Sequence, residues 1–173
     1  MSVFRLPILG PNTIPESTVF PDMVSNQITS AALPSIGGQL CFVMNDGGAD
    51  EGIYGSFAIP KNYVGTPKIV ARGVLDGAPG AADTMGFGFR KRAVANNEAA
   101  DGTYDAEQVV TATIGSNGTA HSDEDEIELS ITLTAGDYAV DDSVYFYFYI
   151  DTSGMTYAGN FLLTSLMFEY TDV

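Results

Sequence analysis

Short runs of alternating apolar and polar residues recur along the chain from residue 40 onward, with turn-forming residues between them. The clearest run, at 126–134, places Ile or Leu at every second position among Glu, Ser and Thr. In residues 84–90, Met and Phe alternate with Gly and Arg in the same way. A period of two is that of a strand with one buried face. Both runs therefore predict half-buried strands.

Eight such runs are present, at residues 40–44, 52–59, 67–75, 84–95, 106–114, 126–134, 143–150 and 161–170. No segment shows a sustained apolar period of 3.6 residues, so we expect no crossover helix. The pattern predicts an all-β fold, an eight-stranded antiparallel jelly-roll sandwich over residues 39–173. An immunoglobulin-like sandwich is the nearest alternative, but one Cys and no Trp do not fit its hallmarks.

Alternation also determines which side chains of each strand face the core, because a shift of one residue would exchange the two faces. The side chains expected in the core are Phe87, Phe89, Ile127, Leu129, Ile131, Phe146 and Phe148. The run 143–150 is aromatic on both faces. We expect it to be a central strand covered on both sides or to lie at a subunit contact. The residues of that possible subunit contact are Tyr145, Tyr147 and Tyr149.

The first 38 residues differ from the rest, because they hold five of the eight prolines. Proline removes backbone donors, so we expect residues 1–38 to be an extended arm without a regular strand. The arm is also apolar, and such a segment usually packs on its own domain or on a neighbouring subunit. The residues expected to make this partner contact are Val3, Phe4, Leu6, Ile8, Leu9, Ile14 and Phe20.

The formal net charge is -15, and residues 93–173 hold fifteen acids and no base. Such a surface repels a nucleic-acid backbone and an anionic membrane, so neither is an expected partner. No apolar run approaches the roughly 20 residues of a membrane span. In a jelly roll the loops 45–51, 76–83, 115–125 and 151–160 meet at one end, and they contain acids but no base. We therefore expect one strongly negative end.

No group of residues has the spacing of a catalytic site. His121 is the only histidine and Cys41 the only cysteine, so neither Ser–His nor Cys–His catalysis has support, and an internal disulfide is impossible. The acidic runs 45–51 and 123–126 offer oxygen ligands for calcium but lack the spacing of an EF-hand loop. A hydrolase with paired carboxylates stays open as an alternative. We expect no enzyme, no catalytic residue, no metal site and no cofactor.

Residues 57–70, FAIPKNYVGTPKIV, resemble a segment of small jelly-roll virion proteins of tailed bacteriophages. Similar features follow at 135–138 (AGDY), 151–152 (DT), 157–159 (YAG) and 168–170 (FEY), so that the resemblance spans about residues 53–170. The chain departs from the family pattern at 72–73 and 150–151. The resemblance implies a structural accessory protein, such as a capsid decoration or cement protein, often trimeric, or a module of a head or tail fibre.

The resemblance, the apolar arm and the negative charge together favour a structural virion protein on the outer capsid surface. We expect a capsid decoration or cement protein, a homotrimer, which binds the major capsid protein and stabilises the head by linking capsid subunits. The alternative is a receptor- or carbohydrate-binding jelly-roll module of a phage tail or head fibre. A carbohydrate-binding module would show an open groove with exposed tyrosine side chains.

Overall fold

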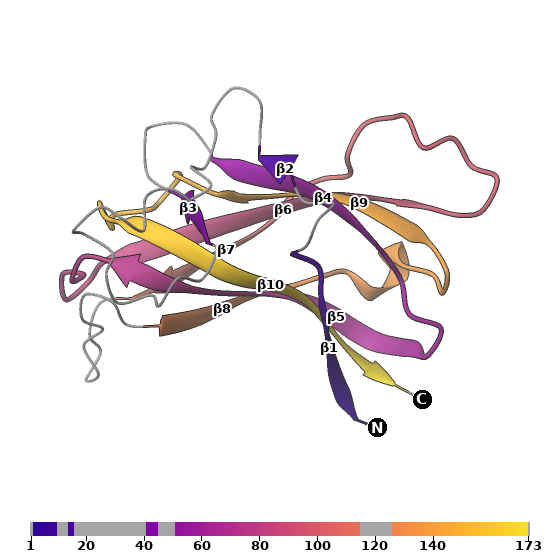
Figure 1. Ribbon diagram of the computed structural model, residues 1–173, viewed down its shortest axis with the longest axis horizontal. Helices are drawn as coiled ribbons and strands as arrows, with labels where there is room; N and C mark the ends of the chain where they lie inside the picture. The colour runs from indigo at the N-terminus through magenta and orange to yellow at the C-terminus, as the bar shows by residue number, and fades with distance from the viewer. Residues whose placement is uncertain (1, 10–13, 16–40, 45–50, 115–125, 173) are drawn as a thin grey trace.

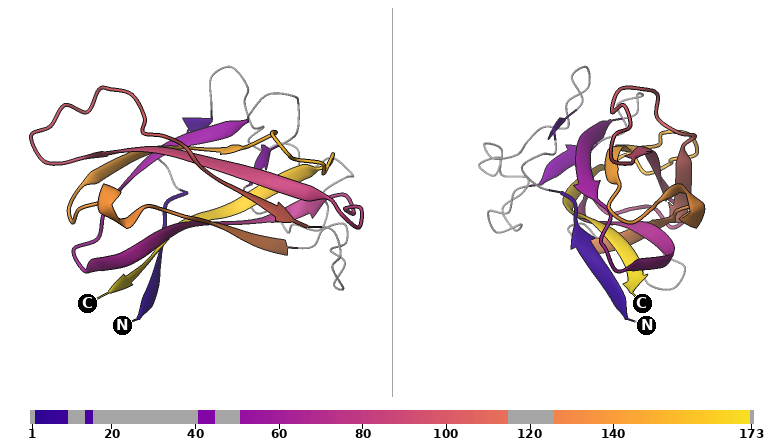
Figure 2. Two further views of the ribbon diagram at one scale, coloured as in Figure 1. Left: turned by 180° about the vertical axis from the view of Figure 1, so that it is seen from behind. Right: turned by 90° about the vertical axis from the view of Figure 1, so that its right-hand side faces the viewer.

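The computed structural model describes residues 2–9, 14–15, 41–44, 51–114 and 126–172, and these form two antiparallel sheets packed face to face (Figure 1, Figure 2). The strands are β1 (Val3–Pro7), β2 (Ile14–Pro15), β3 (Phe42–Met44), β4 (Gly52–Ala58), β5 (Tyr63–Asp76), β6 (Thr84–Val94), β7 (Gln108–Thr113), β8 (Glu126–Thr132), β9 (Ser143–Ile150) and β10 (Asn160–Asp172). A short 3-10 turn, η1 (Ala135–Asp137), lies before β9. The described part of the chain contains no α-helix.

The order of the strands is that of a jelly roll. Sheet A has the order β1-β10-β5-β8, with β3 also paired to β10, and sheet B has the order β2-β4-β9-β6-β7. The eight runs predicted from the sequence correspond to β3 to β10. Their orders, β3-β10-β5-β8 and β4-β9-β6-β7, are those of two interleaved Greek keys, and every pair is antiparallel. The prediction of an all-β jelly-roll sandwich is confirmed.

The core lies between the two sheets and contains the side chains that alternation placed there. Six of the seven predicted core residues are buried, namely Phe87, Phe89, Ile127, Ile131, Phe146 and Phe148. Leu129 is partly buried and packs against the same cluster, whereas its neighbour Glu128 is exposed on the other face. Phe87 stacks on Phe148 within sheet B and meets Phe161 of sheet A at 5.1 Å between ring centroids. Aromatic contacts therefore join the two sheets.

The N-terminal segment is partly built into the sandwich, and the expectation that residues 1–38 lack a regular strand is wrong for residues 3–7. β1 pairs with residues 167–171 of β10, and β3 pairs with residues 161–163, so both lie along one edge of β10. Pro7 occupies the last position of β1, and Pro15 the last position of β2. An edge strand tolerates proline where the missing N–H would point away from its neighbour.

The residues proposed for the contact arm have different environments. Val3 and Phe4 are exposed, and Phe4 stacks on Tyr170 of β10. Ile8 is buried in the core, and the partly buried Leu6 and Leu9 pack against that core. Ile14 belongs to β2, and Phe20 lies outside the described residues. The role of the arm in contacting another subunit stays a prediction.

Ion pairs bind β1 across the outer face of sheet A. Arg5 donates hydrogen bonds of 2.8 Å to both Glu169 of β10 and Glu128 of β8. Lys68 pairs with Glu169 at 3.3 Å, and Arg72 pairs with Glu128 at 2.6 Å. The hydrogen bond from Arg5 lowers the pKa of Glu128 below its ordinary value. Arg5 therefore joins β1 to two other strands, and Lys68 and Arg72 of β5 bind the same two carboxylates.

Two of the loops that sequence reasoning placed at one end do meet there. Tyr157 donates to the carbonyl of Gly77 at 2.8 Å, and the Asn160 amide donates to Asp76 at 2.8 Å. Residues 45–50 and 115–125, which carry His121 and most of the acids predicted for this end, lie outside the described residues. Within the described ranges, no cluster of three His, Cys, Asp or Glu side chains is arranged to hold a metal ion. Nor do these ranges include a helix with the length and apolar character of a membrane span.

Candidate functional site

The outer face of sheet B carries a layer of tyrosine rings. Alternation along β9 directs Phe146 and Phe148 into the core and the intervening tyrosines outward. Tyr147 and Tyr149 stack at 4.9 Å, and Tyr54 of β4 stacks on Tyr147 at 4.6 Å. Tyr104, from the loop between β6 and β7, meets Tyr54 at 6.3 Å. Rings from three separate segments thus form one surface.

Glycines in the strands on either side of β9 make room for these rings. Gly52 of β4 and Gly88 of β6 are both in register with Tyr149. A Cβ atom at Gly52 would overlap the ring of Tyr147, and one at Gly88 would overlap the ring of Tyr149. Since glycine has no side chain, the two tyrosine rings can extend over the neighbouring strands. Tyr149 is in consequence only 1% exposed, although it lies on the outer face.

Tyr149 is fixed by an ion pair beside it. Arg90 donates to Oε2 of Glu107 through Nε at 3.2 Å and Nη2 at 2.8 Å, and the Tyr149 hydroxyl donates to the same oxygen. The guanidinium lies over the Tyr149 ring, 5.3 Å from its centroid. The hydrogen bonds from Tyr149 and Arg90 lower the pKa of Glu107, while burial and the bond to Glu107 raise the pKa of Tyr149. Glu107 is therefore a fixed anion beside a neutral phenol.

Three consecutive basic residues of β6 hold the loop 95–107, which extends at one end of the sandwich (Figure 1, Figure 2). Arg90 binds Glu107, and Arg92 donates to the carbonyl of Ala99 at 2.8 Å. Lys91 is buried and forms ion pairs with Asp105 and, at 3.3 Å, with Asp137. The backbone N–H of Asp105 also donates to the Lys91 carbonyl at 2.8 Å. These contacts place the loop residues against the sheet.

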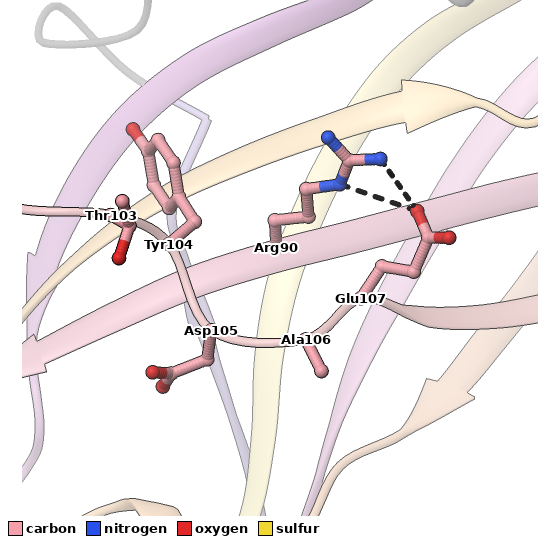
Figure 3. A pocket seen from close by; sticks show the side chains of 6 residues that line it. All are labelled: Arg90, Thr103, Tyr104, Asp105, Ala106 and Glu107. Atoms are coloured by element: carbon pink, nitrogen blue, oxygen red, sulfur yellow. Dashed lines mark hydrogen bonds and ion pairs between the residues drawn. The ribbon is translucent and has the colours of Figure 1, made fainter.

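An open pocket of about 620 Å³ lies between this loop and β6. It is lined by Arg90, Thr103, Tyr104, Asp105, Ala106 and Glu107 (Figure 3). Tyr104, Arg90 and Glu107 point to one side of the loop, while Asp105 points to the other (Figure 3). Tyr104 is 38% exposed. Within the described ranges, Arg90 donates through Nε and Nη2, and Glu107 accepts at Oε2. Among the described residues, neither Nη1 nor Oε1 has a hydrogen-bond partner, and both side chains are partly exposed.

The three tyrosines predicted for a subunit contact differ in their exposure to solvent. β9 is a central strand between β4 and β6, as its aromatic pattern predicts. Tyr145 is 38% exposed, whereas Tyr147 and Tyr149 are buried beneath residues of their own subunit. A contact of these tyrosines with another subunit stays a prediction.

Sequence reasoning gave no role to Tyr104, Arg90 or Glu107. The available signal was the run of three basic residues at 90–92, followed by a loop with acids at 98, 101, 105 and 107. In an acidic chain, such a run indicates cations that pair with nearby carboxylates of the protein and not with an anionic ligand. It could not show which carboxylate each cation binds.

Replacement of Glu107 by glutamine tests the ion pair through its pH dependence. Because the pKa of Glu107 is lowered from 4.5 in the folded protein, its charge stabilises the fold above that pH. This stabilisation is lost as the pH falls through the lowered pKa. We expect Glu107→Gln to have a lower melting temperature than the wild type near neutral pH, with a difference that shrinks in acid. Thermal unfolding from about pH 7 to about pH 3 measures this.

The matched control is Glu126→Gln. Glu126 is exposed on β8, and the described residues contain no ion pair to it. Its melting curve should follow that of the wild type. If the melting temperatures of the wild type and Glu107→Gln differed by the same amount at every pH, the charge of Glu107 would not contribute to the stability of the fold.

The fold and this face together define a jelly-roll β-sandwich with an aromatic, charged pocket on one sheet. No protein-family model matches the chain, and no curated protein matches it. Among solved structures, it is similar to TmCBM27, a carbohydrate-binding module studied for mannan recognition, with 10% identity, 99% of each chain covered and a TM-score of 0.41. A family 35 carbohydrate-binding module from Clostridium thermocellum is 12% identical over 97% of this chain and 98% of that one, with a TM-score of 0.34.

A third similar structure is the arabinose-bound α-L-arabinofuranosidase MgGH51, with 16% identity and a TM-score of 0.42. This chain is covered over 94% of its length but spans only 24% of the arabinofuranosidase. At these identities and TM-scores, the likeness carries no information about a ligand or an activity.

Proposed function

We propose that this protein is a carbohydrate-binding module that holds a neutral glycan in the Tyr104 pocket. One observation carries the proposal: an exposed tyrosine ring lies beside an open donor and an open acceptor in the same pocket. A sugar ring has a face of C–H groups bordered by hydroxyls that both donate and accept. The Tyr104 ring suits the apolar face, while Nη1 of Arg90 and Oε1 of Glu107 suit neighbouring hydroxyls.

Charge favours a neutral glycan over an acidic one. The net charge of the chain is -15, and Glu107 lies in the pocket as an anion. The single cation there, Arg90, is already paired with Glu107 at 2.8 Å. A carboxylated or sulfated sugar would be repelled by the protein as a whole and would have to compete for Arg90.

The lowered pKa of Glu107 favours glycan binding over glycan cleavage. A glycosidase needs a carboxylic acid whose pKa is raised, so that it can protonate the leaving group. The pKa of Glu107 is lowered by Tyr149 and Arg90. The nearby Asp105 is held in an ion pair with Lys91 and points away from Tyr104 (Figure 3). We therefore propose a module that binds glycan without hydrolysing it.

Replacement of Tyr104 by alanine tests the proposal. The wild type should bind neutral oligosaccharides on a glycan array, and calorimetry should give an affinity for those it selects. Tyr104→Ala should lower that affinity about tenfold or more, since an exposed aromatic anchor at the centre of a site carries much of the binding energy. The fold should be unaffected, because Tyr104 lies outside the core.

Phe4→Ala is the control for Tyr104→Ala. Phe4 is 41% exposed, close to the value for Tyr104, but it lies on β1 in the other sheet. This variant should bind glycan as the wild type does. Absence of wild-type binding to every neutral glycan at millimolar concentration would overturn the proposal, as would unchanged affinity in Tyr104→Ala.

The proposed function corresponds to one half of the alternative drawn from the sequence, a receptor- or carbohydrate-binding jelly-roll module of a phage tail or head fibre. The preferred hypothesis, a trimeric decoration protein bound to the major capsid protein, stays a prediction. So does its location on the outer capsid surface. A cryo-EM map of an intact particle, with the chain found on the head or on a fibre, would separate these two hypotheses.

A further inference from the structure

A second pocket lies on the same side of sheet B as the Tyr104 pocket. It has a volume of about 450 Å³, and its lining includes Tyr145, Ser143, Asn96 and Asn97. Tyr145 is 38% exposed, equal to Tyr104. It lies two residues before Tyr147 on β9, which corresponds to about 7 Å along the strand. The second pocket is therefore next to the tyrosine layer.

The loop 95–107 contributes to both pockets. Its first residues line the Tyr145 pocket, and its last residues line the Tyr104 pocket. Between them, the hydrogen bond from Arg92 to the Ala99 carbonyl holds the loop on the sheet. The two pockets thus share one loop, which lines them with different residues. A ligand longer than one sugar could contact both.

Two tight turns form walls of the Tyr145 pocket. Asn97 has φ 70° and Asp141 has φ 67°, and they are the only non-glycine residues with positive φ among those described. In each turn the backbone closes by a 3.2 Å hydrogen bond, from residue 98 to 95 and from residue 142 to 139. Carboxylates of Glu98 and Asp142 accept from the first N–H of their turns at 3.1 Å and 2.9 Å. Hydrogen bonds within the protein therefore preform these two walls of the pocket.

We propose that the Tyr145 pocket is a second glycan subsite, so that the ligand is a neutral oligosaccharide chain that lies across the loop from Tyr104 to Tyr145. This inference rests on the proposed function of the Tyr104 pocket. Tyr145 supplies a second stacking ring, and the amides of Asn96 and Asn97 supply donors and acceptors for hydroxyls. Linked subsites add their contributions, so affinity should rise with chain length until both are filled.

The test uses β-1,4-linked gluco-, manno- and xylo-oligosaccharides and any other neutral series that the wild type selects on the glycan array, from the monosaccharide to the hexasaccharide, in calorimetric titrations. For the series that binds, the wild type should gain about tenfold or more in affinity between the shortest and longest sugars. Tyr145→Ala should remove that gain and leave the affinity for the shortest sugar unchanged. Tyr104→Ala should weaken binding at every length.

Asn97→Gly is a second variant that keeps the turn. Glycine adopts positive φ without strain, so only the amide is lost. It should lower affinity for the hexasaccharide alone. Affinity that does not change with length, or equal losses for short and long sugars in Tyr145→Ala, would overturn the second subsite and leave the Tyr104 pocket in place. No binding of any neutral glycan by the wild type, on the array or in these titrations, would overturn both proposals.

Discussion

Replacing Phe87 by alanine is expected to lower the free energy of unfolding by about 3–5 kcal/mol. Phe87 is fully buried between the sheets. Its ring stacks on Phe148 of β9 at 5.3 Å and meets Phe161 of β10 at 5.1 Å. Truncation to alanine removes these contacts on both sheets and leaves a cavity that the packed strands cannot close. Urea denaturation followed by fluorescence or circular dichroism would measure the loss.

Two further variants provide comparisons for the loss of stability in Phe87→Ala. Phe87→Leu keeps most of the buried volume and should cost less than Phe87→Ala. Val109→Ala alters a residue of β7 that is exposed, and its unfolding free energy should stay within about 0.5 kcal/mol of the wild type. A Phe87→Ala curve that overlays the wild type would contradict a core built on this residue.

Replacing Gly88 by alanine is expected both to destabilise the fold and to weaken glycan binding. The added Cβ would overlap the ring of Tyr149. That ring cannot move freely, because it stacks on Tyr147 and contacts the Arg90 guanidinium. We expect a cost of about 1–3 kcal/mol in the free energy of unfolding. Displacement of Tyr149 would also release Glu107 and Arg90 from their fixed positions, so calorimetry should show weaker binding.

Gly136→Ala is the matched control for Gly88→Ala. Gly136 lies in η1, and a Cβ there would meet no atom within 4 Å. This variant should fold at least as well as the wild type, since alanine restricts the unfolded chain. It should bind glycan normally. If Gly88→Ala binds as the wild type does while Tyr104→Ala does not, the anchoring of Tyr149 is not needed at the site.

The strands and their buried faces were predictable because alternation is a local property. In residues 126–134, the apolar positions alone indicate a strand and its inner face. The structure places Ile127 and Ile131 in the core and Glu128 outside it. The number of such runs and the absence of helical periodicity then restricted the architecture to a two-sheet sandwich.

The pairing of the N-terminal segment was not predictable in the same way. Its prolines argue against a ladder, but an edge strand uses only one side of its backbone. Whether a free edge exists beside residues 3–7 depends on β10, which lies at the other end of the chain. The ion pairs from Arg5 to Glu128 and Glu169 join residues 123 and 164 positions apart. No local pattern contains that information.

The pattern of apolar and polar residues was enough to predict a two-sheet β-sandwich, the buried faces of its strands and a central strand that is aromatic on both sides. The shared pocket of Tyr104, Arg90 and Glu107 is visible only in the folded protein. The loop that carries Tyr104 and Glu107 is held by β6, while the ring nearest Tyr104 comes from β4. The order β4-β9-β6 brings these segments together. Strand order follows from long-range backbone pairing and from the packing of the two sheets, and a local pattern of side chains records neither.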